Sequence, residues 1–187
     1  MIVVIGKLGP DGGGRPTATR IAERVAAQGS AVEIVGVVPA DGTGDRTLLA
    51  LRTAGVGHAA VARNGVSGLE PADLDLALRY LPDIGAIVMV EPGEGLAATA
   101  ASSASWSGAG LVVVTEPGAS SDTDAGDRAI VLAGPTTDPD DAFAGFVAKL
   151  AIQLAAGAAP ADAWAETTNA LGVDALGRTE VRPASST

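Results

Sequence analysis

Short runs of branched apolar residues alternate along this chain with longer segments whose apolar residues recur at helical spacing. The short runs predict β-strands at residues 2–5, 32–38, 86–90, 111–115 and 129–133. The longer segments predict α-helices at residues 16–28, 46–54, 71–81, 96–107, 140–156 and 160–171. This alternation is typical of repeated βα units. We therefore expect an α/β fold with a single doubly wound, mostly parallel sheet and helices on both of its faces.

The length of the chain, 187 residues, is enough for one hydrophobic core. The sequence contains neither an internal repeat nor a linker that would divide it into two domains. Residues 177–187 are polar, and hydroxyl residues follow Pro183 near the end. We expect one α/β domain over residues 1–176 and a flexible tail over residues 177–187.

Acidic residues outnumber basic ones by 22 to 12, which gives a formal net charge of −10. A charge of this sign repels nucleic-acid phosphates and anionic lipid, so we expect neither nucleic acid nor a membrane as a partner. The chain has no cysteine, which excludes disulfides and thiolate zinc sites. No basic leader precedes the first strand, and no apolar stretch approaches the length of a membrane span. We expect an acidic, cytoplasmic protein.

A glycine-rich segment connects the first predicted strand to the first predicted helix. Asp11 is followed there by Gly12, Gly13 and Gly14. Glycines in this position allow backbone N–H groups to approach a ligand, particularly an anion, although a flexible βα turn would have the same composition. The segment matches neither GxGxxG nor a complete P-loop. A Rossmann-like nucleotide-binding module therefore stays open as one alternative.

An acidic segment opens the predicted helix with the clearest apolar stripe. It consists of Asp138, Pro139, Asp140 and Asp141. Carboxylates at a helix N-terminus stabilise the positive end of the helix dipole, so capping is one interpretation. In the other interpretation, Asp141 acts as a general base, or the carboxylates form an oxygen site for Mg²⁺.

Two segments carry a family resemblance. In residues 35–56 an acidic residue and a glycine precede a helix that ends in Ala-Gly-Val, and the matching positions are Asp41, Gly44, Leu48, Leu49, Ala54, Gly55 and Val56. This segment resembles the stretch after the second core strand of the ribokinase-like (PfkB) family of carbohydrate kinases. Residues 141–146 read DAFAGF and are similar to the helix start of the family's second signature, DTTGAGDAFxAGF. The glycines before the first helix and the segment 160–173 are also similar to the family pattern.

The resemblance implies a kinase that transfers the ATP γ-phosphate to a sugar or nucleoside hydroxyl with the help of Mg²⁺. Asp141 would then be the catalytic base. Asp11, Gly12, Gly13 and Gly14 would lie at the substrate site.

The sequence also departs from the family. Residues 7–12 leave no room for the strands of the sugar-covering lid, so we expect the lid to be absent. The family places Gly-Ala-Gly, the anion hole for the transferred phosphoryl group, where this chain has Asp138, Pro139 and Asp140. Proline lacks an N–H donor, and the two carboxylates repel phosphate.

These departures favour a catalytically weak or inactive homologue, a pseudokinase, that binds a small molecule or another protein. A homodimer could cover apolar faces left without the lid. The alternative is an active Mg²⁺-dependent phosphotransferase in which Asp138 and Asp140 bind the metal.

Overall fold

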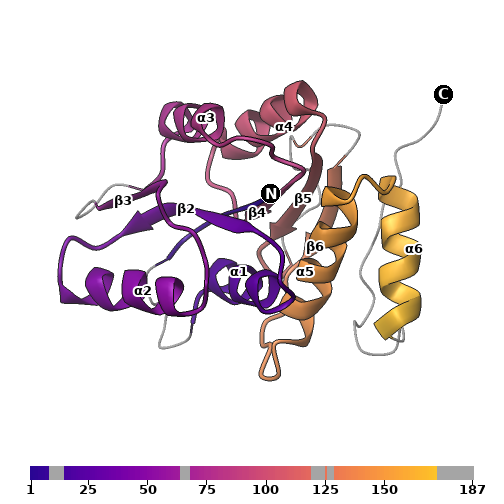
Figure 1. Ribbon diagram of the computed structural model, residues 1–187, viewed down its shortest axis with the longest axis horizontal. Helices are drawn as coiled ribbons and strands as arrows, with labels where there is room; N and C mark the ends of the chain where they lie inside the picture. Colours follow the sequence, from indigo (N-terminus) through magenta and orange to yellow (C-terminus); the bar gives the residue numbers. More distant parts are fainter. Residues whose placement is uncertain (9–14, 64–67, 119–124, 126–128, 172–187) are drawn as a thin grey trace.

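A six-stranded parallel sheet forms the centre of the molecule (Figure 1). The computed structural model describes residues 1–8, 15–63, 68–118, 125 and 129–171. The strands are β1 (Ile2–Ile5), β2 (Val32–Val38), β3 (Val61–Arg63), β4 (Ala86–Val90), β5 (Gly110–Thr115) and β6 (Ala129–Ala133). Their order in the sheet is β3-β2-β1-β4-β5-β6, and every neighbouring pair is parallel. The predicted doubly wound α/β fold is confirmed, and in the described residues every strand belongs to this one sheet.

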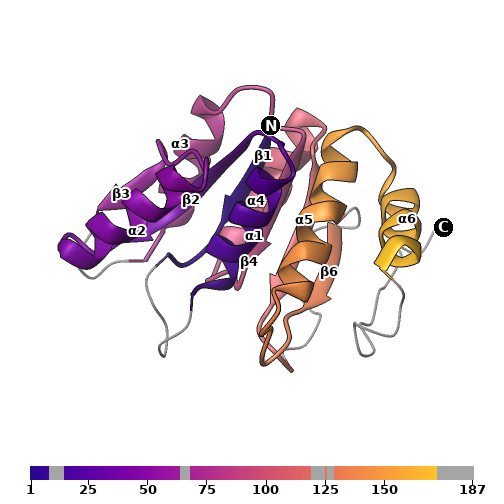
Figure 2. The same cartoon turned by 60° about the horizontal axis from the view of Figure 1, so that its bottom comes forward.

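Helices cover both faces of the sheet (Figure 2). One face carries α1 (Thr17–Ala27), α2 (Gly42–Thr53) and α5 (Ala142–Ala155), and the other carries α3 (Pro71–Tyr80) and α4 (Leu96–Ser107). The last helix, α6 (Pro160–Leu171), packs beside α5. Each side has its own core of aliphatic side chains, because strands covered on both faces bury alternate residues in opposite directions. All four residues of β1 and all five of β4 are buried.

Most strand and helix predictions agree with the structure within one or two residues, but two differ. The sequence analysis missed β3, a three-residue edge strand with little apolar pattern. Helix α2 begins at Gly42, four residues before the predicted start, because Asp41 caps it. The Asp41 carboxylate accepts hydrogen bonds from the backbone N–H groups of Thr43 and Gly44 at 2.8 and 3.2 Å. These bonds, first that from Gly44, lower the pKa of the Asp41 carboxyl.

Two glycines are required by close approach of neighbouring backbone or side chains. A Cβ at Gly44 would lie 1.9 Å from the carbonyl oxygen of Pro39, so the turn before α2 excludes any side chain there. A Cβ at Gly110, the first residue of β5, would lie 2.7 Å from the Cβ of Leu154 on α5. Glycine therefore lets α5 lie directly against the start of β5.

Helix length and apolar content also bear on the expected surroundings of the protein. Among the helices of the described ranges, none combines the length and hydropathy needed to cross a membrane.

The expected tail, residues 177–187, lies outside the described residues, and the domain boundary at residue 176 stays a prediction.

Candidate functional site

The carboxyl ends of the strands form the edge of the sheet at which ligands bind in open α/β folds. Crevices form there where neighbouring strands lead to helices on opposite faces. In this sheet β1 leads to α1 on one face, while its neighbour β4 leads to α4 on the other. The N-termini of α1 and α5 lie at the same edge, and the two helices pack against each other.

The side chain of Asp138 occupies the N-terminus of α5. Its Oδ1 accepts a hydrogen bond from the Phe143 N–H at 3.0 Å, and its Oδ2 accepts one from the Ala144 N–H at 3.1 Å. These N–H groups have no acceptor within the helix, and the helix dipole favours a negative charge beside them. The side chain is only 4% exposed. The capping interpretation of the acidic segment is thus confirmed for Asp138.

Two arginines of α1 bind the same loop. Arg20 Nη1 donates to the carbonyl oxygen of Asp138 at 2.8 Å and lies 3.1 Å from Asp138 Oδ2 and 3.2 Å from Asp141 Oδ1. Arg24 Nη2 lies 3.2 Å from Asp141 Oδ2 and 3.3 Å from the carbonyl oxygen of Asp140. The Arg20 side chain is 16% exposed and that of Arg24 46%. We call Arg20, Arg24, Asp138 and Asp141 the arginine–aspartate cluster.

Asp141, the expected catalytic base, adopts a left-handed backbone conformation with φ of 53°. Non-glycine residues rarely adopt this conformation, and the surrounding contacts must hold it. Here the Asp141 N–H donates to the carbonyl oxygen of Asp138 at 3.3 Å, and the Gly145 N–H donates to the carbonyl oxygen of Asp141 at 2.8 Å. With one carboxylate oxygen beside each arginine, Asp141 joins the first turn of α5 to α1.

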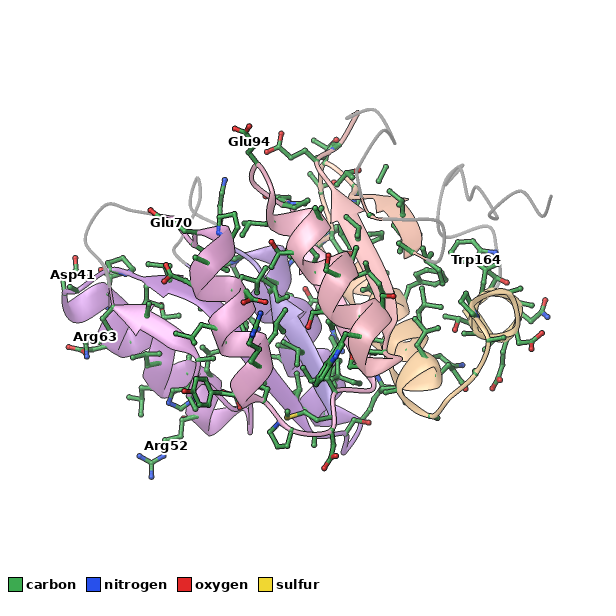
Figure 3. All side chains as sticks on the ribbon, turned by 90° about the horizontal axis from the view of Figure 1, so that it is seen from above. Asp41, Arg52, Arg63, Glu70, Glu94 and Trp164 are labelled. Atoms are coloured by element: carbon green, nitrogen blue, oxygen red, sulfur yellow. The ribbon has the colours of Figure 1, made fainter. Side chains whose placement is uncertain are left out.

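A second left-handed residue lies at this edge of the sheet. Glu91 follows β4 with φ of 48°, and its N–H donates to the carbonyl oxygen of Val114 on the neighbouring strand at 2.7 Å. Glu70 and Glu94, which precede α3 and α4, point outward from the molecule (Figure 3). Three carboxyl residues thus stand at or beside the connections on this side of the sheet.

The remaining residues of the predicted site are not part of the arginine–aspartate cluster. Asp11, Gly12, Gly13 and Gly14 lie outside the described residues. Pro139 and Asp140 are exposed, and the contact recorded for Asp140 is made by its backbone carbonyl oxygen. The substrate, anion-hole and metal roles of these residues stay predictions.

The sequence analysis did not identify Arg20 and Arg24. Their spacing of four residues places both on one side of α1, next to its buried stripe. That spacing could have marked them as a pair. Their acidic partners are more than 110 residues away in sequence, so only the packing of α1 against α5 reveals the contact.

Comparisons with known proteins find similarity in structure alone. No family model matches the sequence, and no curated protein matches it. Fructokinase from Halothermothrix orenii superposes with a TM-score of 0.58 at 11% identity, over 95% of this chain and 99% of that one. Fructokinase with bound ATP from Xylella fastidiosa gives 0.54 at 14% identity, over 90% of this chain and 85% of that one. The fold is ribokinase-like.

A third similar structure is that of a riboside kinase. Aminoimidazole riboside kinase from Salmonella enterica, complexed with aminoimidazole riboside and an ATP analogue, gives a TM-score of 0.51 at 16% identity over 95% of this chain and 93% of that one. The ribokinase-like fold expected from the two sequence segments is therefore confirmed. At these identities the similarity establishes the fold, and any activity must be argued from the residues of this chain.

Proposed function

We propose that this chain is a ribokinase-fold protein with little or no phosphotransferase activity, which binds a small polar molecule of the sugar or nucleoside type. The observation that carries the proposal is the position of the Asp138 carboxylate, on the backbone N–H groups that begin α5. Those N–H groups are the donors that an anion at this helix N-terminus would need.

The N–H donors at the start of α5 are already occupied. Phosphoryl transfer depends mainly on donors and charges placed to stabilise the transferred phosphate. In this loop the Phe143 and Ala144 N–H groups already bind the protein's own carboxylate. The Arg20 guanidinium offsets the Asp138 charge, so the obstacle to a second anion is that both N–H donors are already taken. A phosphate therefore competes with a tethered anion.

The candidate base, Asp141, is paired with two arginines. A general base needs a lone pair within hydrogen-bond reach of the substrate hydroxyl. Both carboxylate oxygens of Asp141 lie 3.2 Å from a guanidinium nitrogen, one from Arg20 and one from Arg24. Each oxygen therefore directs one lone pair at an arginine, and these ion pairs tie the Asp141 carboxylate to α1.

The surroundings of the Asp138 carboxylate do not suit Mg²⁺. The Asp138 carboxylate faces two N–H donors and a guanidinium group, and this environment is one for an anion rather than a ligand set for a hard cation. In the described part of the chain there is no group of three or more His, Cys, Asp or Glu residues placed to hold a metal ion. We therefore propose that Asp138 and Asp140 do not hold Mg²⁺.

A kinase assay tests the catalytic part of this proposal. The protein is incubated with ATP, Mg²⁺ and a panel of sugars and nucleosides, and ADP release is measured. We expect release at the rate of the protein-free control. Steady ADP release that the Asp141→Asn substitution abolishes would show an active phosphotransferase and overturn the proposal.

Binding is tested by thermal shift, because a ligand of the folded state raises the melting temperature. We expect a member of the sugar and nucleoside panel to raise it, whereas ATP with Mg²⁺ leaves it unchanged. The triple substitution Asp138→Gly, Pro139→Ala and Asp140→Gly restores a neutral loop. We expect ATP to stabilise that variant relative to its own ligand-free state. No stabilisation by any panel member would contradict the binding role, and equal ATP shifts in both proteins would contradict the occupied-anion-site argument.

A further inference from the structure

Two of the five aromatic residues lie on the surface of the face covered by α3 and α4. The Trp106 side chain, near the end of α4, is 89% exposed, and Tyr80, at the end of α3, is 81% exposed. Exposing a large apolar side chain to this degree forgoes about 1.5–3 kcal/mol of burial, and Trp is the residue type most enriched among the anchors of protein interfaces. In the described part of the chain the Trp106 side chain is left almost fully exposed, as an interface anchor is before its partner binds.

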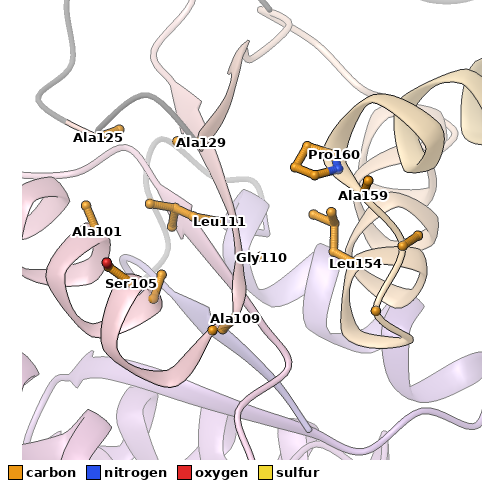
Figure 4. A pocket seen from close by; sticks show the side chains of 14 residues that line it. Ala101, Ser105, Ala109, Gly110, Leu111, Ala125, Ala129, Leu154, Ala159 and Pro160 are labelled. Atoms are coloured by element: carbon orange, nitrogen blue, oxygen red, sulfur yellow. The ribbon is translucent and has the colours of Figure 1, made fainter. Parts of the chain in front are cut away.

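A pocket of about 500 Å³ opens beside the same part of α4 (Figure 4). Ala101, Ala104 and Ser105 line it on the α4 side, while Leu154 and Pro160 line the opposite side. Its volume is within the range of roughly 300–1,000 Å³ that is typical of ligand sites. Among the described residues that line it, Ser105 has the one polar side chain, and none is charged. The pocket is lined by Gly110 and Ala129, the first residues of β5 and β6, so it lies at the amino edge of the sheet, whereas the arginine–aspartate cluster lies at the carboxyl edge.

We propose that α4 and this pocket form an interface between two copies of this chain, in which Trp106 of each copy inserts into the pocket of the other. The inference is independent of the proposed function, because it uses the opposite edge of the sheet. The indole ring would fill an apolar cavity, and the Ser105 hydroxyl can accept the hydrogen bond that a buried indole N–H requires.

Helix geometry brings the two features together. Successive residues of an α-helix are about 100° apart around its axis. On the outer face of α4, this places exposed Ser102 between Ser105 on one side and Trp106 on the other. We place a twofold axis parallel to α4, next to Ser102. Rotation about this axis exchanges the two sides of the helix, so Trp106 of each copy faces Ser105 of the other. The same surface patch thus serves both subunits, as a symmetric dimer requires.

The uncharged outer face of α4 allows a second copy to approach despite the net charge of the chain. The chain has a net charge of −10, so two copies repel each other over most of their surfaces. Helix α4 contains no Asp, Glu, Lys or Arg, and its outer face consists of small residues apart from Trp106. Two copies can approach closely along this face without bringing like charges into contact.

Sedimentation over roughly 1 μM to 1 mM protein tests the proposal. We expect a concentration-dependent dimer whose dissociation constant rises at least tenfold with Trp106→Ala and also with Ser105→Arg, which places a charge in the pocket. Tyr80→Ala is the matched control and should change it by less than threefold. About 0.5 M NaCl should strengthen association by screening the net charge. A monomer throughout this range, or a dimer that Trp106→Ala leaves unchanged, would overturn the proposal.

A cysteine-trapping experiment tests the geometry separately. Because the chain has no cysteine, Ser102→Cys introduces a single thiol, and the proposed axis brings two such thiols together in the dimer. Mild oxidation should give covalent dimers from this variant but not from Ala50→Cys, an exposed position on α2. The Trp106→Ala substitution in the Ser102→Cys background should remove most of the cross-linking. Equal cross-linking of both single-cysteine variants would contradict the proposed axis.

Discussion

At the carboxyl edge of the sheet, charged side chains from α1 and from the loop before α5 hold the N-terminus of α5. At the amino edge, by contrast, the described residues that line the pocket beside the end of α4 are all uncharged. At the first edge, Asp138 already binds the helix N–H groups, and two arginines bind the aspartates. At the second edge, Trp106 is exposed next to apolar surface.

The difference concerns which groups still lack a partner. The Asp138 carboxylate and the backbone N–H groups of Phe143 and Ala144 bind each other, so this helix N-terminus has little capacity left for an anion. Within the described residues, Arg20 Nε is the buried atom of the cluster that makes no hydrogen bond. Apolar surface at the amino edge has no covering among the described residues, and it gains free energy when another molecule covers it. Position in an α/β fold thus indicates where a site can lie, while the side chains decide what can bind there.

The largest expected effect comes from breaking the arginine–aspartate cluster at its buried member. Arg20→Ala should lower the free energy of unfolding by about 3–5 kcal/mol, because it leaves the Asp138 carboxylate, 4% exposed, without its cation. Urea unfolding followed by circular dichroism measures the change. A loss below about 1 kcal/mol would show that the cluster contributes little to the carboxyl edge.

At the amino edge, steric crowding should have a smaller effect. Gly110→Ala should destabilise the protein by about 1–3 kcal/mol, because its Cβ would lie 2.7 Å from that of Leu154. The control is Gly145→Ala in α5, where a Cβ meets nothing within 4 Å and helix propensity predicts a gain of about 1 kcal/mol. Thermal unfolding of both variants should give shifts of opposite sign. A neutral Gly110→Ala substitution would mean that α5 can move away from β5.

The exposed member of the cluster should matter less than the buried one. The Arg24 side chain is 46% exposed, so Arg24→Ala should cost about 0.2–1 kcal/mol. Salt should distinguish the two substitutions further, because dissolved ions screen exposed charge pairs more than buried ones. In about 1 M NaCl the cost of Arg24→Ala should disappear while that of Arg20→Ala persists. Equal salt dependence would contradict the difference in burial.

The smallest effect is the pH dependence of the cap on α2. The pKa of Asp41 is lowered by hydrogen bonds from the Gly44 and Thr43 N–H groups. Because the pKa of Asp41 is lower in the folded state, its ionised carboxylate stabilises that state at every pH above the unfolded-state pKa, near 3.9. This stabilisation is lost as the pH falls through the folded-state pKa. The stability difference between the wild type and Asp41→Asn should therefore be constant near neutral pH and shrink below about pH 4. A difference that grows on acidification would contradict this assignment.

Much of the fold could be predicted because it depends on local pattern. The branched apolar runs that form β1 and β4 are buried on both faces, and such runs are recognisable without any knowledge of their partners. Edge strand β3 was missed because three residues with one exposed face carry little pattern. The early start of α2 was missed because the cap, Asp41, precedes residues of low helix propensity.

The candidate site was predictable only in part. The sequence marked the acidic segment before α5 and offered capping as one of its roles. It gave no sign that Arg20 and Arg24 would neutralise that segment, because those contacts join residues 116 to 121 positions apart. The exposure of Trp106 could not be predicted either, because it depends on how α4 lies on the sheet.

The sequence alone thus determined the alternation of strands and helices, the parallel sheet and the acidic character of the loop before α5. These depend on the spacing of apolar residues and on composition, which act over a few neighbouring positions. Tertiary structure decided which charges pair, which helix N–H groups Asp138 occupies, and where apolar surface remains uncovered. Packing decides these features because it brings α1 against α5 and places α4 beside the start of β5, and no local pattern encodes contacts between residues so distant in the chain.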